Sequence, residues 1–137
     1  ALADAGPNDT VLDLGCGDGA IVVAAARRCG ARGIGIDCDP SLLAAAEARA
    51  KAAGVSTSVT FICGDLFAAD FEAASLVCLY LAPAFYPPLQ DRIRARARPG
   101  TRIVSHDYFF PGWSPIKTEL VRVSAAHVSQ IFMWRVP

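Results

Sequence analysis

An apolar run that passes through three closely spaced glycines into a helical pattern constrains the fold of this chain more than any other feature. Residues 10–21, TVLDLGCGDGAI, read as a buried strand, a tight glycine turn and the start of a helix. Such a turn lets a ligand approach the backbone closely and points free N–H groups toward it. Asp13 places a carboxylate inside a strand that otherwise reads as buried. Burying that charge is costly unless a cationic or hydrogen-bonding group pairs with it, and the ligand could supply that group.

The size and composition of the chain fit one globular domain, which we expect to span residues 1–137. Of these residues 53% are hydrophobic and 19% are charged, as is typical of a well-packed α/β core. The chain begins at Ala1, which leaves open that further residues precede it. The formal net charge is zero, so no nucleic-acid partner is expected. One basic cluster is present, and without interleaved aromatic residues it reads as a solvated helix terminus; its members are Arg92, Arg94, Arg96, Arg98 and Arg102.

The cysteines and the apolar runs indicate the compartment. Five cysteines without a C-x-x-C pair predict neither a disulfide framework nor a metal site, and most of them should act as small hydrophobic residues. No apolar run approaches the roughly 20 residues that span a membrane, and no signal-peptide pattern precedes the first strand. A reducing cytoplasm is therefore the expected location. The oligomeric state is left open by the sequence.

Strand and helix patterns alternate along the chain. Strands are predicted at 10–15, 33–37, 59–63, 76–81 and 101–105, with helices at 19–29, 40–53 and 87–98. Two further β-rich runs, 118–124 and 128–135, are joined by a turn near 125–127. This order predicts an α/β fold in which a mostly parallel, seven-stranded sheet carries helices on both faces and ends in an antiparallel strand pair. Ligands bind such sheets beyond the carboxyl ends of the strands.

The residues that follow the first three predicted strands suit a nucleoside. The glycine turn follows the first strand, and Asp37 follows the second, where an acidic residue can accept hydrogen bonds from both ribose hydroxyls. Asp65 follows the third strand and could accept from an adenine amine, with Leu66 and Phe67 packing against the purine. This ordered set is more specific than a glycine motif alone.

A dinucleotide such as NAD is the competing ligand, because Gly15-x-Gly17-x-x-Ala20 satisfies the dinucleotide fingerprint. The third glycine, however, comes one position early, at Gly19. Asp13 and Asp18 flank the turn and would repel a pyrophosphate. A ligand that carries a sulfonium and an ammonium group would be attracted to the same carboxylates.

Three segments resemble the first motifs of class I S-adenosylmethionine-dependent methyltransferases: residues 11–19, Gly35-Ile36-Asp37 and residues 64–67. The resemblance covers nearly the whole chain and implies a Rossmann-like fold with S-adenosyl-L-methionine as cofactor. It implies that the methionine moiety lies near Asp13 and the glycine loop, with ribose on Asp37 and adenine near Asp65. The implied cofactor residues are Asp13, Gly15, Cys16, Gly17, Asp18, Gly19, Asp37, Cys38, Asp65 and Leu66.

A narrower resemblance concerns the acceptor. Residues 98–109, RPGTRIVSHDYF, with Gly112-Trp113, are similar to small prokaryotic methyltransferases related to archaeal and mitochondrial protein-lysine methyltransferases. This similarity implies N-methylation of a protein lysine. The segment after the fourth strand, residues 81–85, reads LAPAF and lacks the Asn/Asp-Pro-Pro-Tyr/Phe motif of DNA-amine and glutamine methyltransferases.

Three residues near the ends of the fourth and fifth strands are the expected catalytic group. A lysine nucleophile must lose its proton, and Asp107 is the expected orienter or proton acceptor. His106 lies beside it, and Tyr80 would shape the acceptor slot. A turn pair that only packs the loop remains an equal alternative for His106 and Asp107. Trp113 is expected to pack rather than to bind substrate, and His127 to lie exposed in a turn.

Three functions stay open at this point. The first is a methyltransferase that acts on a protein lysine. The second is a methyltransferase of a small molecule, which the same cofactor site would serve. The third is a nucleoside-binding module without catalysis.

Overall fold

The computed structural model describes residues 4–137. Its strands are β1 (Thr10–Leu14), β2 (Arg32–Asp37), β3 (Val59–Cys63), β4 (Leu76–Leu79), β5 (Arg102–His106), β6 (Lys117–Ser124) and β7 (His127–Arg135). Its α-helices are α1 (Ala20–Cys29), α2 (Pro40–Ala52) and α3 (Tyr86–Arg96). Short 3-10 helices are η1 (Leu66–Ala68), η2 (Phe71–Ala73) and η3 (Pro83–Phe85).

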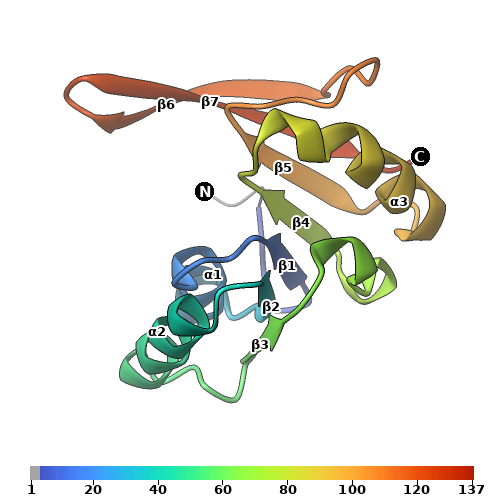
Figure 1. Ribbon diagram of the computed structural model, residues 1–137. Coiled ribbons are helices and arrows are strands. Elements are labelled where there is room, and N and C mark those ends of the chain that lie inside the picture. Colours follow the sequence, from blue (N-terminus) through green and yellow to red (C-terminus); the bar gives the residue numbers. More distant parts are fainter. Residues whose placement is uncertain (1–3) are drawn as a thin grey trace.

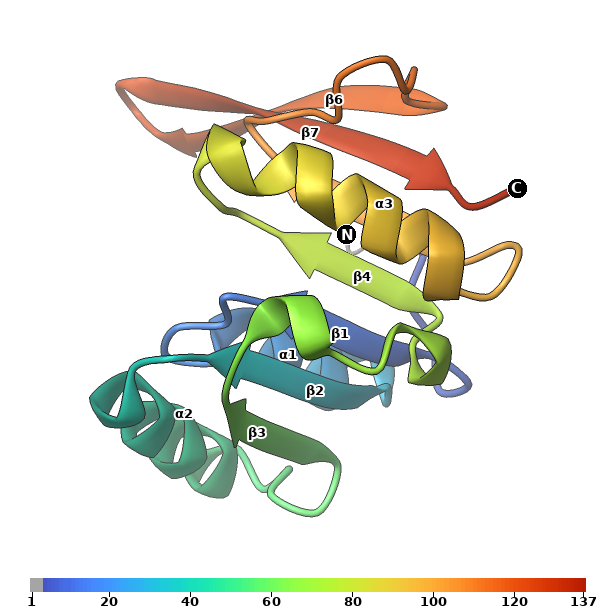
Figure 2. The same ribbon diagram turned by 45° about the vertical axis from the view of Figure 1, so that its right-hand side comes forward.

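All seven strands form one sheet in the order β3-β2-β1-β4-β5-β7-β6 (Figures 1 and 2). Strands β1 to β5 pair in parallel, whereas β7 pairs antiparallel with both β5 and β6. The predicted α/β architecture is therefore confirmed, including the antiparallel pair at the C-terminal end. Strand β1 lies between β2 and β4, so the connections that leave β1 and β4 diverge there and open a crevice at the carboxyl ends.

Helices cover both faces of the sheet. Helices α1 and α2 lie on one face, and α3 with the 3-10 helices lies on the other (Figure 2). The larger core packs beneath α3 and includes the fully buried Leu89, Ile93, Phe110 and Trp134. Beneath α1, small residues such as Ala25 allow the helix to pack closely on the sheet.

Local sequence explains where the helices near the carboxyl edge begin. Gly19 precedes α1 with a φ of 78°, and a Cβ there would lie 2.9 Å from the Cβ of Ala46 in α2. A larger residue would therefore push the two helices apart. Helix α2 begins where Asp39 Oδ1 accepts a hydrogen bond from the Ser41 backbone N–H at 2.9 Å, with Pro40 in the first turn.

Several predicted bounds differ from the structure by one or two residues. The fourth strand ends at Leu79 rather than at residue 81, because Tyr80 and Leu81 leave the sheet toward η3. Helix α3 begins one residue earlier than predicted and ends at Arg96, since Ala97 is extended. Strand β7 begins at His127, so this residue is exposed as predicted but belongs to a strand rather than to the turn.

The β6–β7 hairpin projects beyond the carboxyl ends of the other strands (Figure 1). Its pairing is irregular between Arg122 and Ser124, near the tip. The hairpin therefore borders one side of the carboxyl edge of the sheet, where parallel sheets bind their ligands. Among residues 4–137, no helix is both long and apolar enough to cross a membrane.

Candidate active site

The glycine loop turns sharply at the carboxyl end of β1. The backbone N–H groups of Gly15 and Cys16 both donate to the carbonyl of Ile36, at 2.8 and 2.9 Å. Gly15 has a φ of 75°, and a Cβ on it would lie 2.8 Å from Cδ2 of Leu81. The left-handed backbone favours glycine here, and a Cβ would also have to displace the end of the Leu81 side chain. The loop therefore places bare backbone against the connection that follows β4.

A pocket of about 380 Å³ lies beside this loop, between the ends of β1, β2 and β3 and the segment that follows β4 through the end of η3. It is lined by Gly15, Asp37, Cys38, Gly64, Asp65, Leu66, Phe67, Leu81 and Phe85. The structure thus brings together five of the ten predicted cofactor residues. Its lining is mostly apolar with two carboxylates, as suits the base and sugar of a nucleoside.

Asp37 holds the centre of the site. Its Oδ2 accepts the Gly17 backbone N–H at 2.9 Å, and its Oδ1 accepts the Asp39 backbone N–H at 3.0 Å. Each carboxylate oxygen keeps further acceptor capacity for a ligand hydroxyl. Asp37 therefore has two tasks: it positions the glycine loop from β2, and it can accept from a ribose. The sequence indicated only the second.

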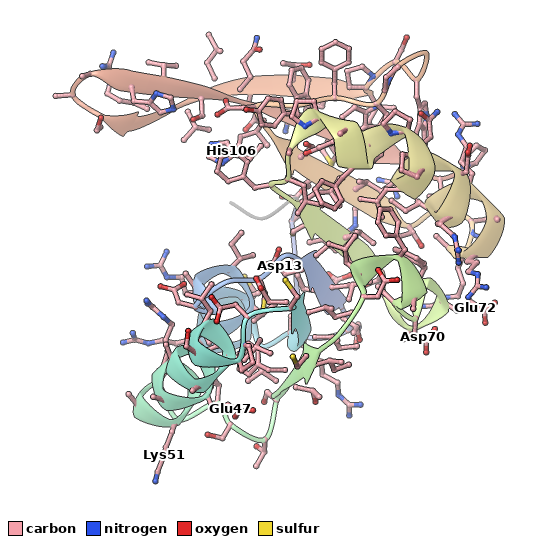
Figure 3. All side chains as sticks on the ribbon, viewed as in Figure 1. Asp13, Glu47, Lys51, Asp70, Glu72 and His106 are labelled. Atoms are coloured by element: carbon pink, nitrogen blue, oxygen red, sulfur yellow. The ribbon has the colours of Figure 1, made fainter. Side chains whose placement is uncertain are left out.

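Asp13 lies behind the loop on β1 (Figure 3) and is 3% exposed. No hydrogen bond to its carboxylate is found within residues 4–137. Burial, together with the nearby charge of Asp37, raises its pKa from 3.8 to about 7. The same burial raises the pKa of the adjacent Cys16 and Cys78 thiols, so both stay protonated beside it. The unpaired carboxylate predicted from the sequence is thus present, and a positively charged ligand would satisfy it.

Asp18 lies at the exposed side of the loop, and its part in cofactor binding stays a prediction. Its Oδ2 forms an ion pair with Arg49 of α2 at 2.8 Å, and its Oδ1 accepts the Ala20 backbone N–H at 3.3 Å. Its charge is therefore already compensated on the outside of the loop. Of the two carboxylates that flank the loop, only that of Asp13 has no cationic partner among residues 4–137.

The base side of the pocket is formed by the segment that follows β3. Asp65 Oδ1 accepts the Phe67 backbone N–H at 2.9 Å and begins η1. This bond presents Leu66 and Phe67 to the pocket, and the Phe67 ring stacks on Phe85 with centroids 5.9 Å apart. Leu81 and Phe85, which come from the connection after β4, were not predicted as site residues. Their only sequence signal was an apolar run directly after a predicted strand.

Tyr80 and His106 gather at the ends of β4 and β5. The Tyr80 ring packs on the His106 ring with centroids 4.4 Å apart. In Figure 3, His106 lies above Asp13 at the same edge of the sheet. Glu47 and Lys51 belong to α2 on one face of the sheet, and Asp70 and Glu72 lie at η2 on the other face. The structure thus brings two of the three predicted catalytic residues into contact beside the glycine loop.

Asp107 is bound mainly to the hairpin. Its Oδ1 accepts the Gln130 backbone N–H at 2.9 Å, and its Oδ2 accepts from Ser129 Oγ at 3.4 Å. Nε2 of His106 and Nε2 of His127 lie 3.8 and 4.0 Å from the same Oδ2. Asp107 has a φ of 67°, an unusual conformation for a non-glycine residue. Asp107 thus fits both interpretations from the sequence. As a turn residue it connects β7 to the end of β5, and as a catalytic group it places one carboxylate near two histidines.

The predicted arginine cluster is only partly a solvated helix terminus. Arg102 lies in β5 and pairs with Asp9. The guanidinium of Arg94 lies over the ring of Trp113, 4.2 Å from its centroid, and Trp113 packs against the core as predicted. Of the five cysteines, Cys16 and Cys78 are buried, Cys29 is partly buried, and Cys38 and Cys63 are exposed, so fewer of them than predicted act as small core residues. Within residues 4–137, no group of acidic, histidine or cysteine side chains is arranged to hold a metal ion.

Comparisons with known proteins agree with this geometry. The ANTKMT methyltransferase domain matches residues 13–117. The chain is 29% identical to a protein-lysine N-methyltransferase of Saccharolobus islandicus, over 93% of this chain and 79% of that protein. It is 36% identical to the adenine nucleotide translocase lysine N-methyltransferase of Mus musculus, over 77% of this chain but only 46% of that protein.

A crystal structure of an RNA methyltransferase from Salinibacter ruber in complex with S-adenosyl-L-homocysteine superposes with a TM-score of 0.90. The two chains are 42% identical, and the match covers 99% of this chain and 86% of that one. These relatives are methyltransferases, so the comparisons support an enzyme that uses S-adenosylmethionine. They give no support to NAD as the ligand or to a nucleoside-binding module without catalysis. The chain belongs to the ANTKMT methyltransferase domain family and is a class I S-adenosylmethionine-dependent methyltransferase.

Proposed function

We propose that this chain transfers a methyl group from S-adenosylmethionine to the side-chain nitrogen of a protein lysine. The observation that carries the proposal is the placement of Asp13, Asp37 and the pocket at one edge of the sheet, beside the exposed ring of Tyr80. S-adenosylmethionine supplies an electrophilic methyl group, so the protein has to bind this cofactor and to present a neutral amine to it.

Different residues of the site bind different parts of the cofactor. Asp37 accepts from the ribose hydroxyls, and Asp65 with Leu66 holds the adenine. Asp13 stabilises the positive end of the cofactor, because its buried carboxylate has no other cationic partner within residues 4–137. Gly15, Cys16, Gly17 and Gly19 shape the loop, and Cys38 lines the pocket beside Asp37.

The acceptor side must accept the proton that the lysine ammonium group loses. His106 is placed for this role, because its ring lies against Tyr80 and its Nε2 is 3.8 Å from Asp107 Oδ2. The carboxylate of Asp107 lies beside the His106 ring and places a negative charge next to it, while its own oxygens accept hydrogen bonds from β7. Of the two roles that the sequence suggested for Asp107, orienter or proton acceptor, this proposal keeps the first and gives the second to His106.

The names of the relatives support lysine as the acceptor, although the chain spans less than half of the mouse protein. RNA is the second candidate, because the Salinibacter structure is described as an RNA methyltransferase and four arginines lie exposed on and just after α3: Arg92, Arg94, Arg96 and Arg98. The zero net charge argues against RNA. A small molecule is the third candidate.

The test is transfer of labelled methyl from S-adenosylmethionine into a lysate divided into protein, RNA and small-molecule fractions. We expect label in protein, released as methylated lysine after acid hydrolysis. The matched variants are Asp107→Asn, which keeps the shape of the turn, and Asp91→Asn, which changes an exposed carboxylate on α3. The first should reduce the rate about 10²-fold or more, and the second should leave it unchanged. Label only in RNA or only in small molecules would overturn the assignment of lysine.

We further propose that residues 1–137 act as one domain in a reducing compartment such as the cytoplasm. A single sheet includes strands from residue 10 to residue 135, which supports one domain. All five cysteines are free thiols, which supports a reducing compartment.

A further inference from the structure

At the carboxyl ends of β4 and β5, the Tyr80 ring contacts two other rings, those of His106 and Tyr108. Tyr80 packs on His106, and its ring centroid is 6.3 Å from that of Tyr108. Tyr80 is 54% exposed and Tyr108 is 36% exposed, so both rings are open to solvent. Aromatic rings exposed together are unusual on a protein surface and mark a binding site more often than isolated ones do.

A buried hydrogen-bonded chain holds this group of rings in place. The buried Tyr86 hydroxyl lies 2.6 Å from Ser105 Oγ, and Ser105 Oγ donates to the Tyr108 carbonyl at 2.5 Å. The Tyr86 ring also meets the edge of Tyr108, with centroids 6.2 Å apart. Since Tyr86 belongs to α3 and Ser105 to β5, the position of Tyr108 is set by two elements of the core rather than by its own loop.

The rings lie next to the cofactor pocket and close to negative charge. Tyr80 directly precedes Leu81, which lines that pocket against Gly15. Asp107 lies between His106 and Tyr108 in the chain, and its Oδ2 is 3.8 Å from His106 Nε2. The electron-rich faces of tyrosine rings attract cations within about 6 Å of their centroids, and a nearby carboxylate adds to this attraction.

We propose that Tyr80 and Tyr108, with His106 packed on the Tyr80 ring, form an aromatic platform that recognises the acceptor by the positive charge of its ammonium group. The platform is thus a determinant of specificity, which selects cationic amines over neutral groups of the same shape. This inference rests on the proposed lysine acceptor, but the binding that it describes can be measured without any methyl transfer.

The chain contains only three tyrosines, which makes the test direct. Protein labelled with ¹³C in its tyrosine rings is titrated, in the presence of S-adenosyl-L-homocysteine, with Nα-acetyl-Nε-trimethyllysine amide. The comparison probe is the neutral isostere in which a tert-butyl group replaces the trimethylammonium group. We expect the charged probe to shift the Tyr80 and Tyr108 signals in a saturable way and to leave the buried Tyr86 signal nearly unchanged. The neutral isostere should bind at least fivefold more weakly.

Two variants at one position separate the ring from its hydroxyl. Tyr80→Phe should keep the affinity for the charged probe within about twofold, because the ring face is retained. Tyr80→Leu should weaken it at least fivefold while the Tyr86 signal shows that the core is intact. Equal affinity for the charged and neutral probes, or equal affinity of the Phe and Leu variants, would overturn the inference.

Failure of the platform and failure of the proposed function give different results. If the variants bind the charged probe alike but lysine methylation proceeds, the platform is refuted and the lysine assignment stands. If the platform discriminates charge as expected but no lysine is methylated, the assignment of lysine fails and the cation site stands.

Discussion

Replacing Asp13 by asparagine should make the cofactor-free protein more stable at alkaline pH. Folding raises the pKa of this carboxyl from 3.8 to about 7. A carboxyl whose pKa is raised on folding favours the folded state at low pH, and this contribution is lost as the pH rises from the unfolded value through the folded one. Between about pH 5 and about pH 8, the parent chain should lose about 2–3 kcal/mol of unfolding free energy from this group.

Asp13→Asn removes the ionisation while it keeps the shape of the side chain. The difference in unfolding free energy between the variant and the parent should therefore rise by about 2–3 kcal/mol between about pH 5 and about pH 8. Asp9 does not obscure the comparison, because its pKa is lowered in the fold, so it is ionised in both states over this range. Asp37→Asn should reduce the slope of the parent but not abolish it, because burial is the larger cause of the raised pKa.

Urea denaturation at several pH values, followed by circular dichroism, measures this difference. In parallel, calorimetry should show that Asp13→Asn binds S-adenosylmethionine about 1–3 kcal/mol more weakly, because a charged partner is lost. The same residue would then destabilise the empty protein and stabilise the complex. A variant with the same pH slope as the parent would refute the assignment of the raised pKa to Asp13.

Three further predictions concern the loop, the ribose side of the pocket and the aromatic platform. Gly15→Ala should weaken cofactor binding at least tenfold in calorimetry, because its Cβ would displace Cδ2 of Leu81, a residue that lines the pocket. Gly17→Ala, which has nothing within 4 Å, should lower the unfolding free energy by the roughly 1–2 kcal/mol of a left-handed alanine but weaken cofactor binding less than threefold, and equal effects on binding would contradict the argument. Asp37→Ala should weaken binding of S-adenosylmethionine by about 1–3 kcal/mol, and an unchanged affinity would remove this residue from the site. Tyr86→Phe should lower the unfolding free energy by about 1 kcal/mol in urea denaturation through loss of a buried hydrogen bond, and a wild-type stability would show that the bond is not needed.

The alternation of apolar strands with helical segments was enough to predict the sheet and its antiparallel end. Register follows from burial, since a slip of one residue in β1 would exchange Leu12 and Leu14 with Asp13 across the sheet. The ends of elements were harder to place. Residues 80 and 81 read as strand because they are apolar, yet they leave the sheet to meet the glycine loop and the acceptor side. The apolar pattern of residues 80 and 81 does not show whether they pair with a neighbouring strand or pack against the glycine loop.

Among the acidic residues too, some could be placed from the sequence and others only from the structure. Asp37 and Asp65 could be placed at the pocket because each directly follows a parallel strand, and neighbouring parallel strands end at one edge. Asp18 looked equivalent to Asp13 in the sequence, but α2 brings Arg49 to within 2.8 Å of it and compensates its charge. A residue 31 positions away cannot be identified as that partner from the sequence alone.

By itself, the sequence determined the sheet, the glycine loop and the presence of a carboxylate in the first strand, because these depend on local spacing and on hydrophobic pattern. Only the tertiary structure decided which carboxylate stays without a partner, and that Asp107 is held by β7 while Tyr80 and Tyr108 form one surface. These features depend on contacts between segments that are far apart in the chain. Their free energies arise from burial and pairing, which exist only once the sheet has assembled.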